Sequence, residues 1–136
     1  MFKKTIEFET FDGEPIKKDF YFNFTKTEIN DMFIDGLESV IQEWVDANKR
    51  REIYYWIKDI ILKAYGEKSE DGIAFMKSEE ISKKFEATLA YDKMVTEIME
   101  DESAQIFFNF FSMCLPKDMQ EEFKKSVTNA MQEANK

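Results

Sequence analysis

Few side chains in this sequence have the types and spacing that enzymes use. Neighbouring carboxylates occur at Glu79–Glu80 and Asp101–Glu102, and paired carboxylates can serve as general acid and base. Adjacent residues on a helix do not face each other, so we interpret both pairs as solvated surface. The segment 67–72, EKSEDG, offers oxygen ligands but lacks the EF-hand spacing for calcium. It is predicted to be a plain loop between helices with a turn glycine.

The sequence also lacks most of the residues that usually carry out nucleophilic and metal-assisted catalysis. The 136 residues include no histidine, which removes Ser-His-Asp and Cys-His catalysis and histidine-ligated metals. Cys114 is the single cysteine, so no intramolecular disulfide forms, and we expect an inert buried thiol. The chain has four glycines, no Gly-rich phosphate loop, no GxSxG and no HExxH. The sequence therefore predicts no catalytic residue, no metal site and no cofactor, and favours a protein that is not an enzyme.

The charge balance argues against two classes of partner. A net charge of −9 opposes nucleic-acid binding, which needs a basic footprint, and disfavours anionic membranes. No apolar run approaches the ~20 residues needed to cross a bilayer. The basic start MFKK is not followed by the apolar h-region of a secretory signal. We therefore expect a cytosolic protein that binds neither nucleic acid nor membrane.

The first 24 residues carry the period of two that is typical of strands. The alternation runs from Phe2 to Phe8, and it returns from Ile16 to Phe24 after the turn sequence FDGEP. Two alternating runs around an Asp-Gly turn predict a β-hairpin, with Pro15 limiting how early the second strand can pair. One face is expected to carry Phe2, Lys4, Ile6 and Phe8 together with Ile16, Lys18, Phe20, Phe22 and Phe24.

Residues 25–134 switch to helical periodicity. Thr25 and Glu28 form a capping box, with Phe24 and Ile29 spaced as a hydrophobic staple. Further boundaries are expected at Gly36, at Gly66 as a C′ glycine, at Ser78 as an N-cap, at the segment 100–103, EDES, and at Pro116 in the first turn of a last helix. The apolar stripes are Leu37, Val40, Ile41, Trp44 and Val45; Ile53, Trp56, Ile57, Ile60, Ile61 and Ala64; Ile81, Phe85 and Leu89; Tyr91, Met94, Val95, Ile98 and Met99; and Met119, Phe123, Val127, Ala130 and Met131.

The predicted fold class follows from these two patterns. It is α+β and mostly α: an N-terminal β-hairpin (residues 1–24) followed by a compact bundle of about five to seven helices (residues 25–134) and a polar, frayed C-terminus. Apolar residues make up 43% and charged residues 35%, which is a globular balance. No repeat, low-complexity tract or linker divides the chain, so we expect a single domain over residues 1–136.

Four phenylalanines fall within five residues, at positions 107, 108, 110 and 111. At about 100° per residue, the apolar side chains from Ile106 to Leu115 cover ~200° of the helix, leaving only Asn109 and Ser112 clearly outside. One core-facing side needs about half that width. The helix is therefore either a core helix buried on two sides, or covered on one side by the fold and on the other by another chain. Under the second alternative the partner-binding residues are Phe107, Phe108, Phe111, Leu115 and Met119.

The eight methionines leave a similar choice open. Methionine is flexible and suits surfaces that adapt to irregular partners, but it also fills gaps in cores.

Several stretches resemble a known family when they are taken together and in order. They are DFYFNFTKTEI (residues 19–29), ILKAYGEKSEDGIAFMKS (61–78), FEATLAYDKM (85–94) and LPKDM (115–119). Their order and spacing resemble the tail assembly chaperones of long, non-contractile-tailed phages and prophages of Gram-positive bacteria. The resemblance spans nearly the whole chain, and its middle block is the most specific part. The stretch IFFNFF is more aromatic than the family pattern.

The resemblance implies a non-catalytic chaperone that binds and solubilises the tape measure protein during tail assembly. It implies a protein made in the host cytoplasm and absent from the mature virion. It also implies that a longer form, made by frameshifting, recruits the tail tube protein. No residue-level motif carries over from the family, and homo-oligomerisation stays open. Two other functions remain as alternatives, an acidic inhibitor that mimics DNA and a structural tail component.

Overall fold

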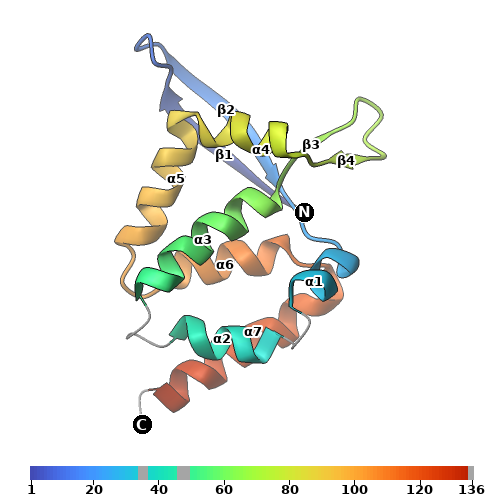
Figure 1. Ribbon diagram of the computed structural model, residues 1–136, viewed down its shortest axis with the longest axis vertical. Helices are drawn as coiled ribbons and strands as arrows, with labels where there is room; N and C mark the ends of the chain where they lie inside the picture. Colours follow the sequence, from blue (N-terminus) through green and yellow to red (C-terminus); the bar gives the residue numbers. More distant parts are fainter. Residues whose placement is uncertain (34–36, 46–49, 135–136) are drawn as a thin grey trace.

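An antiparallel hairpin opens the chain and packs its phenylalanine-rich face on the helices that follow (Figure 1). The computed structural model describes residues 1–33, 37–45 and 50–134. It is 60% helical and 18% strand, which confirms the predicted α+β, mostly α class. The elements are β1 (Phe2–Glu9), β2 (Pro15–Phe22), α1 (Lys26–Met32), α2 (Leu37–Val45), α3 (Arg50–Ala64), β3 (Tyr65–Lys68), β4 (Phe75–Met76), α4 (Glu79–Glu86), α5 (Leu89–Glu100), α6 (Gln105–Cys114) and α7 (Lys117–Ala134).

The first hairpin and its apolar face are as predicted, and the structure supplies the register. Its pairs run from Phe2 opposite Phe22 to Glu9 opposite Pro15, so the second strand starts at the proline. The face that carries Ile6 and Phe20 is buried near the middle of the hairpin. Near the turn this face opens to solvent, because the hairpin extends beyond the helices (Figure 1).

A second hairpin occupies the segment predicted to be a plain loop, so that prediction was wrong. Helix α3 ends at Ala64, and the next residues continue as β3, which pairs with β2 and then with β4. Gly66 is a strand residue rather than a helix C′ residue. A Cβ at Gly66 would lie 2.7 Å from the Phe75 ring and 2.8 Å from the Met76 carbonyl oxygen, so close backbone approach requires the glycine. The sequence of this segment shows no alternation of apolar and polar residues, because its strands have only four and two residues and are held by backbone hydrogen bonds.

The helix boundaries follow local capping chemistry. The capping box is confirmed: the Thr25 side chain accepts from the Glu28 amide, and the Glu28 carboxylate accepts from the Thr25 amide. Ser78 caps α4 as predicted. Leu89 does not continue that helix, because Thr88 caps a separate helix by accepting from the Tyr91 amide.

The separator between α5 and α6 is confirmed at residues 101–104. The Asp101 carboxylate accepts from the Ser103 and Ile106 amides at 3.1 and 2.8 Å, which replaces a side-chain cap on Ala104. Helix α7 starts at Lys117, so Pro116 directly precedes the first turn in which it was expected. The predicted break at Gly36, the side chains of Leu37 and Val40, and the last two residues of the chain lie outside the described residues.

Lys77 ties the second hairpin to the junction between β2 and α1. Its amino group donates to the Asn23 carbonyl at 2.7 Å and to the Glu28 carboxylate at 2.6 Å, and it lies 4.8 Å from the centre of the Phe24 ring. Partial burial would raise the pKa of Glu28, but the hydrogen bonds from Lys77 and Thr25 outweigh it and hold that pKa below its ordinary value of 4.5. The ionised carboxylate is therefore part of the folded structure.

We predict that Lys77→Met lowers the free energy of unfolding at pH 7 by about 1–2 kcal/mol, because two charge-assisted hydrogen bonds are lost. Because the pKa of Glu28 is lowered by folding, its contribution is present above pH ~4.5 and is lost as the pH falls through the folded pKa. The difference between wild type and variant should therefore shrink in acid. Denaturant melts at several pH values measure it.

The matched control is Lys63→Met, which breaks an ion pair with Asp59 that is more than half exposed on both sides. This variant should change stability by no more than a few tenths of a kcal/mol. Equal losses in the two variants, or a Lys77→Met loss independent of pH, would contradict the assigned role of Lys77.

Candidate functional site

Helix α6 is buried on two sides, which is the first of the two alternatives that its aromatic arc left open. On one side Phe110 packs edge-on against Phe2 and Phe22 of the hairpin, with ring centroids 5.7 and 5.2 Å apart. On the other side Phe111 packs against Trp44 of α2 at 5.3 Å and Phe123 of α7 at 5.0 Å. The aromatic cluster therefore joins the sheet layer to the α2–α7 layer.

Four of the five residues predicted to bind a partner belong to this core. They are Phe107, Phe108, Phe111 and Leu115, and none is more than 4% exposed. Met119, in the first turn of α7, is half-buried against the same core. In this conformation the group is not presented on the surface, so its direct contact with a partner stays a prediction that requires α2 or α7 to move.

The exposed stripe of α6 differs from the predicted one. Ile106 and Met113 were placed within the apolar arc, yet they are 45% and 43% exposed. Ser112 was placed outside the arc, yet it is 1% exposed, and its hydroxyl has no hydrogen-bond partner within the described part of the chain. The buried side of α6 therefore includes Ser112 and leaves out Ile106 and Met113. The positions of side chains around an isolated helix do not show which side its neighbours will cover.

A groove lies between α2 and α3, on the helical side of the molecule. Its volume is about 390 Å³, and its lining is Glu43 from α2 with Glu52, Ile53, Tyr55 and Trp56 from α3. Tyr55 is 61% exposed and Trp56 is 37% exposed. The site thus combines two accessible aromatic rings with two carboxylates.

Trp56 connects this groove to the core. Its ring lies perpendicular to that of Trp44 at 5.8 Å, and Trp44 in turn contacts Phe107 at 5.2 Å. The phenylalanines of α6 therefore position the floor of the groove, although they do not line it.

The sequence prediction placed Trp56 on the core stripe of its helix and did not identify the groove. A signal was present in the run Tyr54-Tyr55-Trp56, because three consecutive helical residues spread over ~200° and cannot all face one core. Lys58 lies over the rings of Tyr54 and Tyr55, 4.8 and 5.5 Å from their centres.

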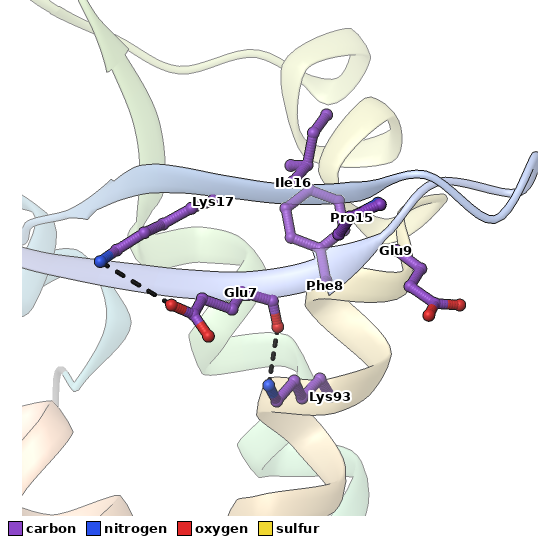
Figure 2. A pocket seen from close by; sticks show the side chains of 7 residues that line it. All are labelled: Glu7, Phe8, Glu9, Pro15, Ile16, Lys17 and Lys93. Atoms are coloured by element: carbon purple, nitrogen blue, oxygen red, sulfur yellow. Dashed lines mark hydrogen bonds and ion pairs between the residues drawn. The ribbon is translucent and has the colours of Figure 1, made fainter.

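A second hollow, of about 500 Å³, lies beside the outer part of the first hairpin (Figure 2). Phe8, Pro15 and Ile16 supply its apolar side chains, and Glu7, Glu9, Lys17 and Lys93 supply charges. Figure 2 shows Lys93 reaching from α5 to the backbone carbonyl of Glu7, a hydrogen bond of 2.7 Å, and Lys17 reaching the Glu7 carboxylate at 3.8 Å.

The remaining reactive groups are held in unreactive states. Burial raises the pKa of the Cys114 thiol well above its ordinary value, so a thiolate does not form near neutral pH. Burial, with the Glu86 carboxylate and Tyr54, raises the pKa of Tyr91 to about 12.

Among the helices that the structure describes, none combines the length and apolar character needed to span a membrane.

Comparison with known proteins finds one family. A family model described as phage tail assembly chaperone matches residues 1–136. No curated protein and no solved structure matches the chain.

Burial of the α6 phenylalanines leads to a stability prediction. Phe108→Asp should lower the free energy of unfolding by about 3–5 kcal/mol or more, because it removes a buried ring and places a carboxylate in its site. Ile106→Asp, on the exposed stripe of the same helix, should cost less than about 1 kcal/mol. Thermal and denaturant melts compare the two. A small cost at both positions would show that this face of α6 is open in solution.

Proposed function

Because the chain belongs to the phage tail assembly chaperone family, we propose that it binds the tape measure protein and keeps it soluble while the tail assembles. The family supports a role in tail assembly with tail proteins as partners, and it is a family of chaperones rather than enzymes. The tape measure protein is the client that suits such a chaperone, because it is very long and mostly helical and would aggregate before the tube forms around it.

The observation that carries this proposal is the aromatic groove between α2 and α3. A client helix can lay its apolar face into a hydrophobic groove, with anchors at helical spacing. Tyr55 and Trp56 supply large, accessible rings of the kind that dominate binding energy at interfaces. Glu52 at the rim favours a client helix whose apolar face is flanked by lysine or arginine.

The predicted residues of α6 take an indirect part in this scheme. Phe107, Phe108 and Phe111 all pack on Trp44, with ring centroids 5.2, 6.2 and 5.3 Å away. Trp44 packs on Trp56 of the groove. In our proposal these side chains keep the groove in shape, and Leu115 and Met119 complete the core behind it.

The overall charge serves the same role. A net charge of −9 repels like-charged complexes, so chaperone-covered clients stay dispersed. Several copies along one long client add weak contacts by avidity. We also propose that the protein acts in the host cytoplasm, that it is absent from the mature virion, and that a frameshifted longer form recruits the tail tube protein.

The proposal predicts that co-expression with the tape measure protein of the same phage moves that protein into the soluble fraction, where the two co-purify. Unchanged solubility together with no co-purification would refute it. Mass spectrometry of purified virions tests the alternative of a structural tail component, which requires the protein to be present in stoichiometric amounts.

A surface variant tests the groove itself. Tyr55→Asp should reduce co-purification of the client at least about tenfold, because it replaces an exposed aromatic anchor by a charge and leaves the core intact. Ile73→Asp is the matched control, since Ile73 is 86% exposed on the turn of the second hairpin and lies outside the groove. Equal capture by both variants, each with a wild-type melting temperature, would place the binding surface elsewhere.

A further inference from the structure

One turn of helix α3 carries a carboxylate and two aromatic rings on the same side. Tyr55 and Trp56 follow Glu52 by three and four residues, a spacing that makes side chains neighbours on a helix surface. All three line the groove between α2 and α3, together with Ile53 and with Glu43 from α2. The groove therefore brings negative charge and aromatic surface together within one helical turn.

Aromatic rings beside a carboxylate attract cations. The face of an aromatic ring is the negative part of its quadrupole, so it attracts ammonium and guanidinium groups, and the tryptophan ring does so most strongly. A carboxylate adds a charge-assisted hydrogen bond to the same group. Helix α3 already uses this attraction once, because the amino group of Lys58 lies 4.8 and 5.5 Å from the centres of the Tyr54 and Tyr55 rings.

The part of this surface that faces the groove suits a positively charged ligand. Among the described residues that line the groove there is no lysine or arginine, and Lys58 lies outside that lining. Tyr55 is more than half exposed, Trp56 is more than a third exposed, and Glu52 is exposed as well. The rings and the carboxylate are therefore accessible from solvent, and charge complementarity favours a cation supplied by another molecule.

An arginine side chain fits this surface better than a lysine does. Its planar guanidinium stacks on aromatic faces and can give a carboxylate two parallel N–H groups, whereas the lysine ammonium is a compact, strongly hydrated charge. The groove has a volume of about 390 Å³, near the lower end of the range for small-ligand pockets. That space accommodates one or two large side chains, so a bound helix would lie over the groove and insert them.

We propose that the groove binds an arginine side chain that the client helix carries inside its apolar stripe. The guanidinium packs on the rings of Tyr55 and Trp56 and pairs with the Glu52 carboxylate, while an apolar neighbour of the arginine packs on Ile53. The inference rests on the proposed function, because it takes the client to be a helix in this groove. It adds that a cation within the stripe, and not only at its flanks, selects the client.

A single arginine inside an apolar stripe also marks a helix that needs a chaperone. Such a helix packs poorly on other helices, because burying a charge without a partner is costly. Exposing its apolar residues to water is costly too. The groove satisfies both parts of the helix at once, since it offers aromatic and aliphatic surface to the apolar side chains and a carboxylate to the charge.

Synthetic peptides test the inference without the natural client. The first peptide is an amphipathic helix with leucines along one face, one arginine at the centre of that face and uncharged polar residues elsewhere. Its twin has citrulline in place of the arginine, which keeps the shape of the side chain but removes the charge. Calorimetric titration into the full-length protein should show the arginine peptide binding at least about tenfold more tightly than its twin.

Two variants at exposed positions show whether the groove supplies this preference. Glu52→Gln removes the carboxylate, and Tyr55→Leu keeps an apolar side chain but removes the ring, so each should lower the preference for arginine over citrulline several-fold. Glu80→Gln is the control, because it removes the same charge from an exposed position of α4 outside the groove. It should keep the wild-type preference, and all three variants should keep the wild-type melting temperature.

The inference is overturned by either of two kinds of result. Equal affinity for the two peptides, or no binding of either, would show that the groove does not select a cation. A preference that survives in both Glu52→Gln and Tyr55→Leu, or that falls equally in Glu80→Gln, would assign it to the overall charge or to another surface. Capture of the tape measure protein tests the proposed function separately, because it can succeed without the arginine preference if a purely apolar stripe suffices.

Discussion

The burial of one aromatic helix on both sides is the constraint on which the rest of this structure depends. Neither a lone hairpin nor a lone ten-residue helix is stable in water. Here Phe110 gives the hairpin an apolar surface to pack on, while Phe111 gives α2 and α7 theirs. Among the elements that the structure describes, α6 lies close both to β1 of the sheet and to α7, so it connects the sheet with the layer formed by α2 and α7.

The same constraint decides where binding can occur. The phenylalanines that look most suited to a partner are fully used in holding the layers together. The groove lies outside this core. Trp44 packs on Phe107 of α6 and also on Trp56, which lines the groove. The proposed binding surface is therefore continuous with the core, and the shape of the groove depends on buried side chains.

Helix α2, which supplies one wall of the groove, lies at the end of the molecule opposite the turn of the first hairpin (Figure 1). In the proposed function the groove presents aromatic rings, which suit a client helix. For a long client, several weakly bound copies together hold more firmly than one.

Local physics let the sequence alone determine much of this protein. The period of two up to Phe24, the Thr25–Glu28 capping box and the Ser78 cap each depend on neighbours within a few residues, and each was predicted correctly. The strand at Tyr65–Lys68 was not, because it has only four residues without an alternating pattern and its partners on β2 are more than 40 residues away in the sequence. The two-sided burial of α6 and the exposure of Trp56 were also decided only by tertiary structure. A helix's apolar arc shows how much surface must be covered, but whether the cover is the same chain or another depends on where the remaining elements pack.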